Sequence, residues 1–251
     1  MPSMSNCCAD ALHNDLLSAL QDEGYQRLLP NLRLVTFSLG QTIYDTSERH
    51  DAVYFPTTSV ISLVYTTLNG STAEIGVIGC DGMLGIPLLL GGDTMPHRAV
   101  ALIAGRAIAV RATVAQNEFL RNNRLQQVVL GYVQALLTQI SQTAVCNRLH
   151  SMEQRLCRWL LMCQDRAHSD EFRMTQEFIS QMLGGRRESV TVAAGRLQDA
   201  GMIQYARGHV RIVDRCALEG VACECYRVVR IECNRLHDKV LELNRQHLIQ
   251  A

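Results

Sequence analysis

The 251-residue sequence has no uninterrupted apolar run of membrane-spanning length. The longest candidate, residues 99–110, is broken by Gly105 and Arg106, whereas a spanning helix needs about 20 apolar residues. The N-terminal segment has neither the basic region nor the apolar region of an export signal. We therefore expect a cytoplasmic protein that has no membrane partner.

The sequence also has no net charge and a single lysine. The 24 basic and 24 acidic residues cancel, and Lys239 is the only lysine. Arginine forms paired hydrogen bonds with carboxylates, phosphates and guanine edges, although a GC-rich coding sequence would produce the same excess. An apolar content of 47% with 19% charged residues excludes a disordered or fibrous chain. The length allows one large or two ordinary domains.

Signatures of common enzyme classes are missing as well. The sequence contains no G-x-x-x-x-G-K, no H-E-x-x-H and no G-x-S-x-G, which are the motifs of P-loop proteins, zinc proteases and serine hydrolases. Its eight histidines show no regular pairing with carboxylates. We expect no catalytic activity. An enzyme of an unrecognised type is kept only as the last alternative.

The ten cysteines follow no spacing that is typical of zinc or iron–sulfur sites. Cys7 and Cys8 are adjacent, and Cys223 and Cys225 form a C-x-C pair. Two residues on a helix that are two positions apart point to different sides, so we expect Cys223 and Cys225 not to share an ion unless the chain bends there. We predict buried, reduced cysteines, and no metal site.

The first part of the chain has a strand pattern. After a helical opening over residues 9–29, short apolar runs alternate with turn residues, and Asn69-Gly70 is a strong hairpin signal because both residues tolerate a positive φ. Closely spaced short strands indicate a sandwich or barrel. The expected strands cover residues 34–37, 41–44, 52–55, 60–68, 71–78, 97–103 and 106–111.

A helical period begins near Val114 and continues past Asn147. The approximate heptad through Val129, Leu136 and Thr143 favours pairing with a second copy, although the apolar side could instead lie on its own domain. We therefore expect a homodimer, with domains over residues 1–113, 114–148 and 149–251. The expected interface residues are Leu125, Val129, Tyr132, Val133, Leu136 and Ile140.

Charge is divided unequally along the chain. Residues 1–147 carry eight basic and eleven acidic side chains, and residues 148–251 carry 16 and 13. A nucleic-acid surface, if present, is therefore expected in the C-terminal part.

Residues 174–214 read as two short helices joined by Gly184-Gly185 and followed by a hairpin. The second helix has an apolar side through Val190 and Leu197 and a charged side that begins at Arg187. Arginine donates to guanine and glutamate accepts from cytosine in the major groove, although a merely solvated helix face would carry the same charges. The candidate DNA-binding residues are Thr175, Arg186, Arg187, Glu188, Ser189, Thr191, Arg196, Arg207 and His209.

The stretch LGGRRESVTVAAGRLQDAGMI resembles the recognition helix of the Crp/Fnr superfamily of bacterial transcription regulators. The order of β-roll, long helix and winged helix-turn-helix is also similar to that family. The resemblance implies that Arg187 and Glu188 read bases, that Ser189 reaches a phosphate and that Val190 is buried. Val192 departs from the family's cyclic-AMP receptor, which has another base-reading arginine there.

The stretch IGCDGMLGIPLLLGGDTMPHRAVAL resembles the phosphate-binding cassette of cyclic-nucleotide domains. Ile86 stands where that cassette has a ribose-binding glutamate, and Ala99 replaces its hydroxyl residue. Losing two hydrogen bonds of about 1–3 kcal/mol each makes cyclic AMP an unsuitable effector. Another small molecule as the effector is kept as an alternative. Arg98 could otherwise pair with an acid such as Asp93. The candidate ligand residues are Gly82, Gly85 and Arg98.

Together these features predict an α+β protein: an N-terminal double-stranded β-helix (jelly roll) of the cyclic-nucleotide-binding type, a long dimerisation helix and a C-terminal winged helix-turn-helix. The expected function is transcription regulation on an inverted-repeat operator. The expected partners are double-stranded DNA, a second copy and RNA polymerase, with the cofactor left open. The alternative is a ligand-binding or protein-interaction module without sequence-specific DNA binding.

Overall fold

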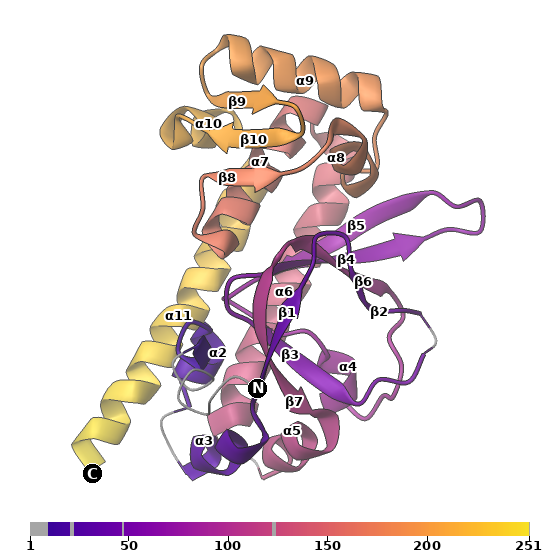
Figure 1. Ribbon diagram of the computed structural model, residues 1–251. Coiled ribbons are helices and arrows are strands. Elements are labelled where there is room, and N and C mark those ends of the chain that lie inside the picture. Colours follow the sequence, from indigo (N-terminus) through magenta and orange to yellow (C-terminus); the bar gives the residue numbers. More distant parts are fainter. Residues whose placement is uncertain (1–9, 21–22, 47, 122–123, 251) are drawn as a thin grey trace.

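The computed structural model describes residues 10–20, 23–46, 48–121 and 124–250 (Figure 1), so Cys7 and Cys8 lie outside the described residues. Within the described residues, the expected helical opening over residues 9–29 consists of short helices: α2 (Asp15–Ser18), α3 (Glu23–Leu28) and η1 (Leu29–Asn31). The buried Asn14 caps α2 through its side-chain oxygen. Its Nδ2 donates to the carbonyls of Pro56 and Gly82, at 2.9 Å each, and so ties this segment to the sheets.

Two antiparallel sheets form the N-terminal jelly roll, and a strand lies at each of the seven expected positions. One sheet has the order β1-β7-β3 and the other β2-β6-β4-β5. Apolar side chains such as Val53, Ile61 and Ile108 fill the space between them. The strands are β1 (Arg33–Phe37), β2 (Thr42–Tyr44), β3 (Ala52–Pro56), β4 (Val60–Thr66), β5 (Thr72–Ile78), β6 (Arg98–Ile103) and β7 (Gly105–Arg111), with α4 (Ile86–Leu89) between β5 and β6.

The expected hairpin at Asn69-Gly70 is confirmed as the β4–β5 connection. Of these two turn residues, only Gly70 has a positive φ, of 82°. Asn69 contributes through its side chain instead, since its Oδ1 accepts from the Ser71 amide at 3.1 Å. The hairpin extends sideways out of the roll and passes beneath α8 (Figure 1).

The helical segment after the roll consists of two helices and not one. Helix α5 (Ala112–Phe119) precedes α6 (Arg124–Leu149), which has 26 residues. By length and composition α6 could cross a membrane, with a mean hydropathy of 1.2. It is apolar on average, without an uninterrupted apolar run, which explains why the sequence showed no such segment. Packing within the chain covers only part of this apolar character, since 28% of the 18-residue window with that hydropathy is buried.

The side of α6 expected to form a dimer faces the chain's own core. Leu125, Val129 and Tyr132 are buried in the jelly-roll cluster, and Val133 and Leu136 pack against that cluster. Ile140, like Leu136, lies beside Gly76 of β5. The assignment of Leu125, Val129 and Tyr132 to a dimer interface is therefore wrong. For Val133, Leu136 and Ile140, which are only partly buried, it stays a prediction. The apolar residues left exposed on α6 are Leu130, Leu137, Val145 and Leu149.

The C-terminal domain has a core around Trp159, Ile179, Val190 and Leu197, and Val60 and Val77 of the jelly roll belong to the same cluster. Two helices follow its hairpin, and residues 168–172 include the start of a strand with the buried Phe172. Its elements are α7 (Met152–Ala167), β8 (Glu171–Arg173), α8 (Gln176–Met182), α9 (Arg187–Asp199), β9 (Ile203–Ala206), β10 (His209–Ile212) and α10 (Arg215–Val221).

The last helix, α11 (Glu224–Gln250), leaves this domain and runs back along α6 toward the N-terminal helices (Figure 1). Gly131 of α6 permits the close approach, since a Cβ there would lie 2.9 Å from Leu236 Cδ1. Leu236 thereby joins the jelly-roll core. Helix α11 thus brings the C-terminal part of the chain beside the N-terminal helix α2.

Candidate nucleic-acid interface

Helices α8 and α9 are set by local backbone signals. Thr175 Oγ1 accepts from the Phe178 amide at 3.1 Å and caps α8. Gly184 has a φ of 58° after α8, as expected for a residue that ends a helix in the left-handed conformation. The turn between the helices therefore forms as the sequence predicts.

Helix α9 has the two sides that the sequence predicts. Val190, Ala193, Ala194 and Leu197 are buried against the domain core. The opposite side is exposed from the first turn onward. The exposed predicted residues on and beside it are Arg186, Arg187, Glu188, Ser189, Thr191 and Val192.

The hairpin β9–β10 forms a wing beside α9. Its two-residue turn, Arg207-Gly208, has φ values of 51° and 77°, the combination that matches the twist of a two-stranded ribbon. The Gly208 carbonyl accepts from the Met174 amide at 2.7 Å, and the Tyr205 hydroxyl donates to the Met174 carbonyl at 2.9 Å. These bonds hold the wing against the start of α8, with Arg207 and His209 exposed.

Two contacts sort the predicted residues further. Thr191 Oγ1 lies 2.8 Å from Gln176 Oε1, so Gln176, which sequence reasoning missed, joins this surface. Arg196 forms an ion pair with Glu153 of α7 at 3.3 Å. Its charge is therefore already paired with a carboxylate of the chain itself. Within the described residues, by contrast, no carboxylate pairs with Arg186, Arg187 or Arg207. Their charges are free for an external anion.

Comparisons with known proteins agree with this arrangement. A family model described as a Crp-like helix-turn-helix domain matches residues 154–221. The global nitrogen regulator of Synechococcus elongatus is 22% identical over 217 residues, which cover 83% of this chain and 97% of that protein. The chain is a DNA-binding transcription regulator with a Crp-like helix-turn-helix domain.

Solved structures show the same fold. FixK2 from Bradyrhizobium japonicum matches the regulator with a TM-score of 0.65 at 15% identity, over 76% of this chain and 98% of that one. CLP of Xanthomonas campestris, described as a c-di-GMP-responsive global regulator, matches with a TM-score of 0.62 at 13% identity, over 76% and 98% of the two chains. At these identities the structures support the fold alone.

The cassette glycines of the regulator serve packing. A Cβ at Gly82 would lie 2.4 Å from the Tyr132 ring. Gly85 has a φ of 112°, and a Cβ there would lie 2.8 Å from Val53 Cγ1. Both glycines are buried, so the structure does not place them beside a ligand. Burial also raises the pKa of the nearby Tyr44 phenol, which donates to the Ala52 carbonyl and stays neutral.

Arg98 is held by groups of the regulator itself. Its Nη2 donates to Thr42 Oγ1 at 2.9 Å, and its Nε lies 3.6 Å from Asp45. The suggested pairing with Asp93 is wrong, because Asp93 pairs with Arg49 at 3.1 Å. Gly82, Gly85 and Arg98 thus each have a packing or pairing role within the chain, and a ligand site at these residues stays a prediction.

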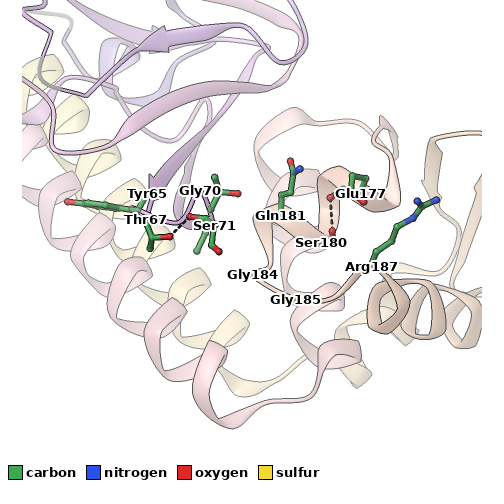
Figure 2. A pocket seen from close by; sticks show the side chains of 12 residues that line it. Tyr65, Thr67, Gly70, Ser71, Glu177, Ser180, Gln181, Gly184, Gly185 and Arg187 are labelled. Atoms are coloured by element: carbon green, nitrogen blue, oxygen red, sulfur yellow. Dashed lines mark hydrogen bonds between the residues drawn. The ribbon is translucent and has the colours of Figure 1, made fainter.

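A cavity of about 670 Å³ lies where the β4–β5 hairpin meets α8 and the start of α9 (Figure 2). Its lining includes Tyr65 and Ser71 from the hairpin side and Glu177, Gln181 and Arg187 from the other. Ala73 of β5 also approaches the turn between α8 and α9, since a Cβ at Gly184 would lie 3.7 Å from its own. Sequence reasoning missed this contact because it depends on how two separately folded parts meet.

The C-x-C pair does not lie on one continuous helix, which was the premise for expecting the two thiols to point apart. Cys223 precedes the first residue of α11 whereas Cys225 lies within it, so the two thiols do not diverge as on a continuous helix. Both lie near Cys146 and His150 of the regulator, with the ligand atoms within 4.8 Å of one another. These are the described residues that could hold a metal.

Proposed function

We propose that the regulator binds an inverted-repeat operator in double-stranded DNA as a homodimer, with α9 in the major groove. The observation that carries this proposal is the exposed first turn of α9, where Arg187 and Glu188 stand over the buried Val190. Arg187 would donate to guanine O6 and N7, and Glu188 would accept from cytosine N4. A rigid helix with unpaired cations at its start suits such reading.

The surrounding exposed residues would anchor the DNA backbone. Ser189, Thr191 and Thr175 carry hydroxyls on this surface, and Arg207 at the wing tip carries an unpaired charge. Phosphate contacts of this kind fix the position of a protein on the duplex but carry no sequence information. Arg196 is left out of this set because Glu153 already pairs with it.

The homodimer would form through the exposed side of α6. Leu130 and Leu137 are 49% and 60% exposed, Val145 is 41% exposed, and the first two are one heptad apart. A two-fold axis along this side would bury all three residues in a helix–helix seam. The two α9 helices would then contact half-sites roughly 34–36 Å apart.

We also propose that the jelly roll does not use cyclic AMP, because Ile86 and Ala99 lie in its apolar core. We further propose a cytoplasmic, non-enzymatic protein that works with RNA polymerase and has no membrane partner. A different small molecule could act on it, as the name of CLP indicates for that protein. The proposed domains follow the sequence limits, 1–113, 114–148 and 149–251.

Selection from a random duplex library with the full-length protein tests the proposal. We expect an inverted repeat to be enriched, and a scrambled duplex to bind about a thousandfold or more weakly at physiological salt. Affinity for either duplex should fall steeply as salt rises. Equal affinity for selected and scrambled duplexes, or the absence of salt-dependent binding, would contradict it.

A further inference from the structure

Four metal-ligand side chains converge where α6 meets α11. Cys146 and His150 are one helical turn apart at the end of α6, and Cys223 and Cys225 flank the first residue of α11. Cys146 Sγ lies 3.5 Å from Cys223 Sγ, and Cys225 Sγ lies 3.6 Å from His150 Nδ1. All four ligand atoms lie within 4.8 Å of one another, and the three cysteines are buried.

These separations match the coordination shell of a single ion. Zinc binds sulfur at about 2.3 Å and imidazole nitrogen at about 2.0–2.1 Å, so the ligand atoms of a tetrahedral site lie about 3.5–3.8 Å apart. The Cys146–Cys223 and Cys225–His150 separations, 3.5 and 3.6 Å, agree with that spacing. Three thiols and an imidazole offer each other only weak hydrogen bonds, which leaves hydrogen bonding a poor reason for burying them together.

The groups around the cluster also suit a metal. His150 Nε2 lies 3.3 Å from Glu224 Oε1, which leaves Nδ1 directed at the thiols, and metal-binding histidines commonly have their second nitrogen held by a carboxylate. The buried Arg158, whose Nη2 donates to Thr143 at 2.9 Å, interacts electrostatically with Cys146 and Cys225. Three thiolates around a divalent ion carry a net charge of −1, which Arg158 would offset.

We propose that Cys146, His150, Cys223 and Cys225 bind one zinc ion in a closed Cys₃His site. Thiolate and imidazole ligands select zinc over magnesium or calcium, which prefer oxygen. Four protein ligands leave no open coordination position, so the ion has a structural role.

The site lies at the base of the DNA-binding domain. Cys146 precedes α7 and Cys223 follows α10, 77 residues later, so the ion closes a loop that contains the whole helix-turn-helix. Closing a long loop restricts the unfolded chain and stabilises the folded one. The ion also fixes α11 to the end of α6, from which the DNA-binding domain extends.

Metal analysis of the full-length protein, purified with a thiol reductant and without chelator, tests the proposal. We expect one zinc per chain, and after exchange with Co²⁺ the visible absorption of a tetrahedral thiolate complex. Cys225→Ser should lower the zinc content to less than a tenth. Cys216→Ser, which removes an exposed thiol in the same region, should retain one zinc.

Glu224→Gln provides a second variant that keeps all four ligands. Since Glu224 is 66% exposed, the fold should survive, and zinc affinity measured by chelator competition should fall roughly 10- to 100-fold. The proposal fails if the reduced wild-type protein takes up neither Zn²⁺ nor Co²⁺, or if the four residues hold iron and sulfide. A Cys146–Cys223 disulfide in the purified protein, or zinc retained in folded Cys225→Ser, would also overturn it. If Cys225→Ser does not fold, the wild-type stoichiometry and the affinity of Glu224→Gln decide.

Discussion

Trp159 Nε1 of α7 donates a 2.8 Å hydrogen bond to Glu74 Oε1 of β5, across the boundary between the DNA-binding domain and the jelly roll. Both side chains are buried, and Ser62 donates to the other carboxylate oxygen at 2.6 Å. A second link lies nearby, where Arg166 of α7 pairs with Asp81 at 2.9 Å. The two halves of the regulator are therefore joined by buried polar contacts as well as by α6.

Trp159→Phe should destabilise the protein by about 1–3 kcal/mol, because it leaves an oxygen of Glu74 buried without its donor. Urea unfolding followed by circular dichroism measures this, since Trp159 is the only tryptophan. Combined with Glu74→Gln, the effect should be non-additive. Tyr205→Phe, which removes a hydroxyl bonded within the wing, should combine additively with Glu74→Gln. Additivity in both pairs would show that the Trp159–Glu74 contact carries no coupling.

Stability should fall as pH rises toward neutrality because of Glu74. Burial raises the pKa of this carboxyl to about 7 from 4.5, against the opposing effects of Ser62, Trp159, Arg158 and Arg166. A raised pKa means that the folded state binds the proton more tightly, so the contribution is complete below pH 4.5 and is lost as pH rises through about 7.

Glu74→Gln tests this sign. The stability of the wild type relative to the variant should drop by on the order of 1–3 kcal/mol between pH 5 and pH 8. Glu171→Gln, at an exposed carboxylate of β8, should show no such change. A pH-independent difference between wild type and Glu74→Gln would mean that Glu74 does not titrate in this range.

The strands and the two sides of α9 could be predicted from the sequence because their signals are local. Residue alternation, turn residues such as Gly70 and Gly184, and the buried Val190 need no knowledge of distant contacts. The prediction of which side of α6 faces a second copy failed for a physical reason. Apolar residues occur around much of this helix, and only the position of the roll decides that Leu136 is inside and Leu137 outside.

The partners of charged and sulfur side chains were harder to predict. Arg98 pairs with Asp45, and Arg196 pairs with Glu153, through contacts between elements that are distant in sequence. The cysteine cluster likewise exists only because α11 returns along α6. Ligand spacing within one segment could not reveal it, since Cys146 and Cys223 are 77 residues apart.

Cyclic AMP should not bind the jelly roll at sub-millimolar concentration. Ile86 and Ala99 are buried among apolar side chains and offer neither a carboxylate nor a hydroxyl to the nucleotide. Titration calorimetry of the full-length protein should show no binding heat. Arg98→Ala serves as the companion variant, because heat that appears in the wild type and disappears in this variant would place a nucleotide at the cassette and contradict the prediction.

Leu137→Glu should convert the dimer to a monomer, because it places two like charges in the proposed seam while leaving the protomer's own core intact. Light scattering measures the change. Leu68→Glu, at the fully exposed hairpin tip, should leave the dimer unchanged. Leu136→Glu should instead lower folding stability, since Leu136 packs against β5. A dimer that persists in folded Leu137→Glu would place the interface elsewhere.

Arg187 and Arg207 should differ in how they contribute to DNA binding. If Arg187 donates two hydrogen bonds to guanine, Arg187→Ala should cost about 1–3 kcal/mol on the selected operator and little on random DNA. Arg207→Ala should weaken both duplexes alike and lower the salt slope by about one, because it removes a phosphate contact. Glu188→Ala should change which base is tolerated, since a carboxylate repels phosphates.

Arg211→Ala is the matched control, because Arg211 is exposed in the same domain but already lies 3.6 Å from Glu171. Gel-shift titrations on both duplexes at two salt concentrations separate these outcomes, and equal losses for Arg187→Ala and Arg207→Ala on every sequence would show that α9 does not read bases.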